Sequence, residues 1–188
     1  MDYSLTTFIL TTLVFFSVAA KAALLRRAGV RAVRFGERDK KDNILIPCML
    51  FFYYMAAAEA FGLPVAGRRL FYRYFVHWYG SALCFAGLIF ITAALVTLGQ
   101  SFRIGIDDVK PGALITSGPF AINRNPIYTG FLMVFAGVFI TYANWVFIIY
   151  FAAGALIINR QIVREEESLK KAYGSEYIDY CKRVRRYF

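Results

Sequence analysis

The sequence predicts an all-α integral membrane protein with about five transmembrane helices, followed by cytoplasmic helices at the C-terminal end. Of its 188 residues, 59% are hydrophobic and 18% are charged, whereas soluble domains are usually about 45–50% apolar. The hydrophobic residues also form long uncharged blocks, and a helix needs about 20 of them to cross the hydrocarbon of a bilayer. The basic residues lie almost entirely outside these blocks.

The spans follow from the blocks in chain order. Residues 3–20 carry no charge, and we expect a first span rather than a cleavable signal peptide, because neither a basic n-region nor a cleavage site flanks them. Residues 44–66 and 74–99 predict the second and third spans. Residues 126–158 are too long for one crossing, so a tight turn at Tyr142–Ala143–Asn144 divides them into two helices.

The segments around this hairpin predict the rest of the C-terminal half. The loop 99–125 is long, apolar and rich in turn signals, with Pro111–Gly112 and Gly118–Pro119 on either side of Leu114–Ile115. Loops of this length in compact proteins are often functional. After the hairpin we expect a helix over about 159–174 that leaves the membrane, and a short last helix from near Ser175.

The distribution of basic residues predicts the orientation of the chain. The formal net charge is +10. Nineteen of the 22 Lys and Arg residues lie in residues 21–41, in the loop after the third span and in the C-terminal tail, and three lie at the other membrane face. The positive-inside rule then places the N-terminus outside and the C-terminus in the cytoplasm. The charge therefore reflects topology and anionic headgroups rather than nucleic acid as a partner.

The first candidate site is the stretch NRNPIYTG, residues 123–130. Pro126 favours the first turn of a helix, and the residue before a proline is usually extended. Open N–H groups of that turn, together with Arg124, could attract an anionic group. Alternatively, Asn125 caps the helix and Arg124 extends to the headgroups. Tyr128 should face the same pocket, and Gly130 and Gly137 predict close helix packing.

The second candidate site is RQIVREEESLKKAYG, residues 160–174. On a helix, Glu165 and Glu166 flank an apolar face, whereas Glu167 lies on the far side. Two carboxylates against an apolar face need a cation nearby. That cation could belong to a ligand, or it could be Lys170 or an arginine of the loop. The two sites together predict an anion site and a cation site, which suits a zwitterionic amino acid, with the apolar turn at 112–119 suited to adenine.

Other polar residues are candidates without a clear partner in the sequence. Glu59 lies at span depth, where an acid is a functional candidate, unless it is hydrated near the outer interface. His77 lies among aromatic residues and fits an interface position. The three cysteines are widely spaced, and with one histidine the sequence predicts no metal site.

The run LITSGPFAINRNPIYTG, followed by EEESLKKAYGSEYIDYCKRVRRY, resembles the isoprenylcysteine carboxyl methyltransferase and phospholipid methyltransferase superfamily. Its members carry a pattern like R-H-P-x-Y-x-G and then E-E-x-x-L. The resemblance covers about residues 98–187. Asn125 stands where the family most often has histidine, as in a bacterial branch, and Phe120 where it often has tyrosine.

The resemblance implies a membrane methyltransferase that uses S-adenosyl-L-methionine on a lipophilic acceptor, either an isoprenylcysteine-like carboxylate or a lipid headgroup. It implies a three-span scaffold over 1–98 and a cofactor-binding half over 99–188, within one structural unit. Leu114 and Ile115 would line the adenine site. The remaining cofactor-binding residues would be Gly118, Asn125, Pro126, Tyr128, Glu165 and Glu166, and the catalytic residues Arg124, Tyr128 and Glu166.

Two other functions compete with this interpretation. Membrane NADPH-dependent reductases of the steroid-reductase type resemble N-P-N-Y-x-G-E, but Ile127 and Phe131 replace the Asn and Glu of that pattern. A non-enzymatic scaffold or transporter subunit is the other. Transporters usually place polar groups near the midplane, whereas here they collect at one membrane face.

Overall fold

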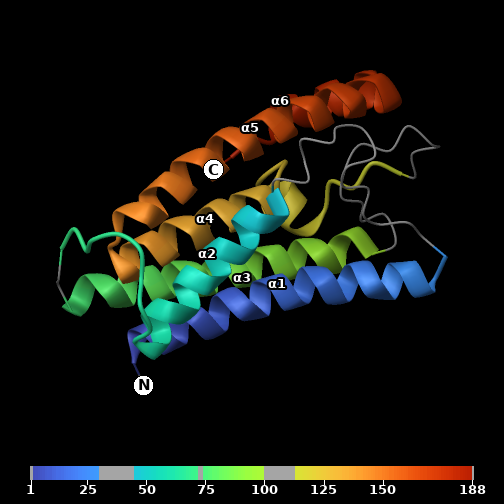
Figure 1. Ribbon diagram of the computed structural model, residues 1–188. Helices are drawn as coiled ribbons and strands as arrows, with labels where there is room; N and C mark the ends of the chain where they lie inside the picture. The colour runs from blue at the N-terminus through green and yellow to red at the C-terminus, as the bar shows by residue number, and fades with distance from the viewer. Residues whose placement is uncertain (1, 30–44, 72–73, 100–112, 188) are drawn as a thin grey trace.

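The computed structural model describes residues 2–29, 45–71, 74–99 and 113–187, and these residues form a helical bundle (Figure 1). Apart from an isolated antiparallel bridge between Arg69 and Asn144, the described regular structure is helical. The helices are α1 (Tyr3–Arg27), α2 (Leu45–Phe61), α3 (Tyr74–Leu98), η3 (Gly118–Ala121), α4 (Pro126–Tyr142), α5 (Trp145–Tyr173) and α6 (Ser175–Arg183).

Successive long helices run in alternating directions, so the bundle has two distinct ends (Figure 1). One end, called here the α6 end, holds the start of α4, the last turns of α5 and α6. Helices α1, α3 and α5 are long and apolar enough to cross a membrane, and Pro47–Phe61 and Pro126–Tyr142 are shorter apolar helices. The all-α membrane fold is confirmed. The count of five spans and their orientation stay predictions.

The predicted break between the fourth and fifth spans is confirmed at Ala143 and Asn144. Ala143 adopts the left-handed conformation, with φ of 51°, and ends α4. The Asn144 side chain then accepts a hydrogen bond from the Val146 N–H and caps α5. Helix α5 continues without interruption to Tyr173, and α6 begins at Ser175 as expected. Helix α1 extends beyond the predicted 3–20, and α2 ends before the predicted residue 66.

Four glycines bring α3 and α4 into backbone contact. A Cβ on Gly137 would lie 2.5 Å from Cys84 Sγ and 2.6 Å from the Gly80 carbonyl. Gly87 and Gly130 are similarly close further along the pair, since a Cβ on Gly87 would lie 2.8 Å from the Gly130 carbonyl. The prediction of close packing at Gly130 and Gly137 is therefore confirmed. This contact fixes where α4 begins relative to the rest of the bundle.

Buried hydroxyls join α1 to this pair. Thr7 Oγ1 lies 2.7 Å from Ser81 Oγ and 3.0 Å from Thr141 Oγ1, and all three residues are buried. The Tyr142 hydroxyl donates to the Ser4 carbonyl. In an apolar environment such groups need partners, so these bonds satisfy polar groups while they hold three helices together.

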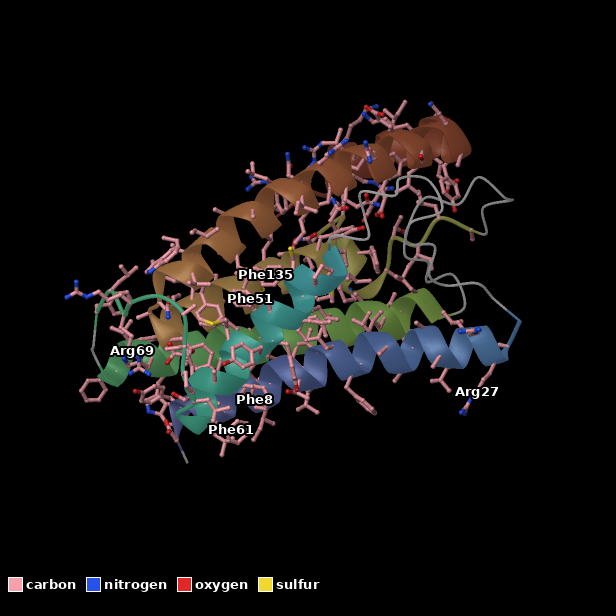
Figure 2. The ribbon with its side chains drawn as sticks, viewed as in Figure 1. Phe8, Arg27, Phe51, Phe61, Arg69 and Phe135 are labelled. Carbon is pink, nitrogen blue, oxygen red and sulfur yellow. The ribbon has the colours of Figure 1, made fainter. Side chains whose placement is uncertain are left out.

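An ion pair between a buried carboxylate and a partly exposed arginine closes the end opposite to the α6 end. Glu59 is buried and accepts from Arg69 Nη2 at 2.6 Å and from Asn144 Nδ2 at 3.3 Å. Figure 2 shows Arg69 at this end and Arg27 at the other. The expectation of a hydrated Glu59 is therefore wrong, because Arg69 compensates its charge. His77 is buried within the bundle and stacks on Tyr3 with ring centroids 4.6 Å apart, and its expected place at the membrane interface stays a prediction.

We predict that Gly137→Ala destabilises the bundle, because the added methyl would press against the α3 backbone and Cys84. Overpacking of this kind costs about 1–3 kcal/mol. Thermal unfolding of the detergent-solubilised protein measures the effect. Gly154→Ala is the matched control, since its neighbour is the Phe135 ring, which can turn aside. Equal shifts of the unfolding midpoint in the two variants would contradict the helix contact.

Candidate functional site

The start of α4 is organised by Asn123 rather than by Asn125. Asn123 is fully buried, its Oδ1 accepts from the Asn125 N–H at 2.7 Å, and its Nδ2 donates to Thr129 Oγ1 at 2.9 Å. Pro126 occupies the first helical position as predicted. Asn125 stands at the N-cap position but makes no capping hydrogen bond with its side chain. Its amide instead donates to Glu166, so the capping alternative is wrong.

Helix α5 presents one carboxylate within its buried face. Ile158, Ile162 and Glu166 are buried at steps of four residues, so the acid continues an apolar stripe. Glu165 is half-buried beside it, and Glu167 is exposed. The predicted faces of the three successive acids are confirmed.

Glu166 is the centre of a hydrogen-bonded cluster. Its Oε1 accepts from Arg124 Nε at 3.3 Å and Nη2 at 3.1 Å, and from Asn125 Nδ2 at 3.2 Å. Its Oε2 accepts from Arg186 Nη2 at 2.7 Å and Nε at 3.2 Å. The alternative in which a loop arginine pairs with these acids is thus confirmed for Arg124. Two guanidinium groups compensate a carboxylate whose side chain is only 5% exposed.

Arg124 uses four of its five N–H donors inside the protein. Two bind Glu166, and Nη1 donates to the carbonyls of Cys181 and Val184 at 3.1 and 2.9 Å. Its side chain is 12% exposed, so it does not extend to the headgroups. The guanidinium instead caps the C-terminal end of α6, where free carbonyls favour a cation.

The residues after α6 lie over the same cluster. The Arg124 N–H donates to the Arg185 carbonyl at 3.0 Å, and Asn125 Nδ2 reaches the Arg186 carbonyl at 3.4 Å. The Tyr187 hydroxyl donates to Asn159 Oδ1 on α5. Hydrogen bonding to Glu166 raises the pKa of the Arg186 guanidinium, which stays charged. Residues 184–187, the C-terminal segment, are therefore part of the site.

Glu165 has a different set of partners. Its Oε1 accepts from the Tyr128 hydroxyl at 2.5 Å and from Gln161 Nε2 at 2.9 Å. Within the part of the chain that the structure describes, both hydrogen-bond partners are neutral. The expected inward orientation of Tyr128 is observed, and its hydroxyl joins the first turn of α4 to α5.

The apolar turn lies at the same end of the bundle as the start of α4 (Figure 1). Gly118 begins η3 with φ of 59°, and a Cβ there would lie 2.8 Å from Thr97 Oγ1 on α3. The Tyr180 hydroxyl of α6 donates to the Phe120 carbonyl at 2.6 Å. Leu114 and Ile115 are half-buried just before η3, and none of the described hydrogen bonds joins them to the cluster. Residues 100–112 of the predicted functional loop lie outside the described residues.

The structure therefore joins Arg124, Asn125, Tyr128, Glu165 and Glu166, which are residues that the sequence singled out. Sequence reasoning missed Asn123, Gln161 and Arg186. Asn123 lies within the NRNP motif and Gln161 precedes Glu165 by one helical turn, so both carried a local signal. Arg186 carried none, because a basic tail is the normal consequence of topology.

Comparisons with known proteins agree with this geometry. Residues 75–176 match the family described as phospholipid methyltransferase. The chain is 32% identical over 115 residues to the protein-S-isoprenylcysteine O-methyltransferase B of Arabidopsis thaliana, and the match covers 57% of this chain and 58% of that protein. It is 34% identical over 95 residues to the protein-S-isoprenylcysteine O-methyltransferase of Mus musculus. This match covers 49% of this chain and 34% of the mouse protein.

The fold also resembles a solved structure. The eukaryotic intramembrane Ras methyltransferase ICMT, an isoprenylcysteine carboxyl methyltransferase, matches 87% of this chain with a TM-score of 0.60 and 22% sequence identity. This chain covers 58% of that protein, so it spans little more than half the length of these relatives. The match supports the overall fold of the chain.

We predict that Arg124→Ala releases the C-terminal segment, because the change removes four hydrogen bonds and one of the two cations on Glu166. Trypsin cleavage after Arg183 and Arg185, followed by mass spectrometry, should become about tenfold faster or more, since opening of the segment becomes less costly. The control is Arg164→Ala, which removes an exposed arginine of α5. Similar cleavage rates in both variants would show that Arg124 does not hold the segment.

Proposed function

We propose that this chain, which belongs to the phospholipid methyltransferase family, is an integral-membrane methyltransferase that uses S-adenosyl-L-methionine to methylate a lipophilic acceptor. The observation that carries the proposal is the joining of the start of α4 to the paired acids of α5. Arg124 and Asn125 bind Glu166, and Tyr128 binds Glu165. These contacts bring the two halves of the sequence motif together at one end of the bundle.

The chemistry of the cluster fits the amino-acid end of this cofactor. Glu165 accepts hydrogen bonds from neutral groups only, among the residues that the structure describes, and burial raises the pKa of its carboxyl. An ammonium or sulfonium group beside it would therefore favour its charged form. The guanidinium groups beside Glu166 supply donors for a carboxylate. We propose that Glu165 and Glu166, with the arginines that Glu166 orients, form the site for this end of the cofactor, and that Leu114, Ile115 and Gly118 lie beside the adenine.

The proposed cofactor supplies a methyl group that is already activated by its sulfonium, so the protein has to orient the reactants and exclude water. Tyr128 holds Glu165 in place through its hydroxyl, and Pro126 fixes the direction in which α4 starts. Arg124 holds Glu166 and the C-terminal segment with four N–H groups. A direct contact between Arg124 and a carboxylate acceptor stays a prediction. The described hydrogen bonds leave one of the five Arg124 N–H groups unused for such a contact.

The acceptor is proposed to be a lipid-like molecule that enters sideways from the bilayer. The relatives are named for methylation of S-isoprenylcysteine, and an isoprenylcysteine-like carboxylate or a lipid headgroup would suit the apolar bundle around the site. The basic tail supports, by the positive-inside rule, a reaction at the cytoplasmic face with the N-terminus outside. In this proposal the acceptor comes from the membrane, and the anionic headgroups of the same membrane attract the basic residues of the chain.

We predict that the solubilised protein binds S-adenosylhomocysteine, the product of the proposed cofactor, and does not bind NADPH. Isothermal titration calorimetry measures both. The choice of ligands separates the proposal from its rivals, the NADPH-dependent reductase and the non-enzymatic scaffold. Binding of NADPH alone would overturn the methyltransferase, and binding of neither would favour the scaffold. Incubation of lipid extracts with labelled cofactor, followed by mass spectrometry, would then identify the acceptor.

We also predict that Glu166→Ala weakens binding of S-adenosylhomocysteine far more than Glu167→Ala. Removal of Glu166 leaves two guanidinium groups without their shared carboxylate, whereas Glu167 is exposed on the other side of α5. A loss of charge-assisted hydrogen bonds of this kind corresponds to a change in affinity of about tenfold to a hundredfold. Calorimetric titration of the two variants provides the measurement. Equal losses would show that the face of α5 that carries Glu166 does not face the ligand.

A further inference from the structure

Arg186 differs from Arg124 in what remains free on its guanidinium. Its Nε and one N–H of Nη2 point at Glu166, at distances of 2.7 to 3.3 Å. The described hydrogen bonds use neither Nη1 nor the second N–H of Nη2. The side chain is 39% exposed, whereas that of Arg124 is 12% exposed. Arg186 is therefore held on one edge and open on the other.

Glu166, in contrast, has no capacity for a further donor. It accepts from five N–H groups, two from Arg124, one from Asn125 and two from Arg186. A carboxylate offers about four lone-pair sites. An ammonium group would have to displace one of these donors before it could bind Glu166. The carboxylate therefore orients the two arginines. The charged groups of a ligand would bind neighbouring residues instead.

The charges of the cluster then separate into two sites. Arg124, Arg186 and Glu166 together carry one net positive charge, and the open part of that charge lies on Arg186. The described hydrogen-bond partners of Glu165 are neutral and burial raises the pKa of its carboxyl, so a cation beside it would favour its charged form. Glu165 and Glu166 are adjacent on α5, so the open part of the Arg186 guanidinium and an acid with neutral described partners both lie at the α6 end. The carboxylate and ammonium of an amino acid complement these two groups.

We infer that Arg186 binds the α-carboxylate of the cofactor's amino-acid end while Glu165 takes its ammonium, an assignment that rests on the proposed function. Arg186 reaches this position because Glu166 orients its guanidinium and because Arg124 and Asn125 hold the backbone of the C-terminal segment. A planar guanidinium fixed on one edge presents parallel donors on the other, which matches a carboxylate. Arg186 is thus a binding residue supplied by the last residues of the chain.

The test compares two ligands that differ in the amino-acid end. S-adenosylhomocysteine carries the carboxylate and ammonium, whereas 5′-methylthioadenosine keeps the adenosine and sulfur and lacks both groups. Isothermal titration calorimetry is run on the full solubilised chain, on Arg186→Gln and on the control Arg185→Gln. Arg185 is exposed, and none of the described contacts uses its side chain, so the control removes the same charge one residue away.

We expect Arg186→Gln to weaken S-adenosylhomocysteine about tenfold or more, with affinity for 5′-methylthioadenosine changed less than twofold and Arg185→Gln near wild type for both. Arg186→Lys should recover part of the loss. Unchanged or increased affinity of Arg186→Gln for S-adenosylhomocysteine would overturn the assignment, and so would an equal loss for both ligands. If the wild-type protein binds neither ligand, the proposed function itself fails, which is a different result from loss of the Arg186 effect alone.

Discussion

The arrangement of the site depends on the compensation of one buried carboxylate. Glu166 lies in the buried stripe of α5, where an unpaired charge would cost several kcal/mol. It is compensated by Arg124, 42 residues earlier in the chain, and by Arg186, 20 residues later. Because both guanidinium groups bind one acid, the start of α4, the last turns of α5 and the C-terminal segment have to meet. Removing any member leaves the others with unsatisfied polar groups.

The same principle operates at the other end of the α4–α5 hairpin. There Glu59 is compensated by Arg69, and Asn144 binds the acid while it also caps α5. The two clusters fix the hairpin at both ends, and the glycine contacts between α3 and α4 fix it along its length. A methyl-transfer site needs its groups held in a constant geometry. The bundle supplies this rigidity with helix contacts and polar clusters, without a separate soluble domain among the described residues.

Much of the local structure could be predicted from the sequence. Pro126 marks the start of α4, the polar break at residues 142–144 marks the hairpin, and the spacing of three successive glutamates gives their faces on α5. Each of these features depends on residues within one or two helical turns. The predictions that were wrong concern the partners and the burial of single side chains. The Asn125 side chain does not cap its helix but donates to Glu166, and Glu59 is not hydrated but buried against Arg69.

The sequence by itself determined that the chain forms apolar helices, where α4, α5 and α6 begin, and which acids and arginines are available at the ends of the bundle. Hydrophobicity, proline and helical spacing are local properties, so they can be read without knowledge of the fold. The tertiary structure alone decided how the charges pair. Arg186 looked like one of many basic residues in the tail, and only the return of the C-terminal segment along α5 brings it to Glu166. Pairing depends on distance in space, and segments far apart in sequence carry no local sign of it.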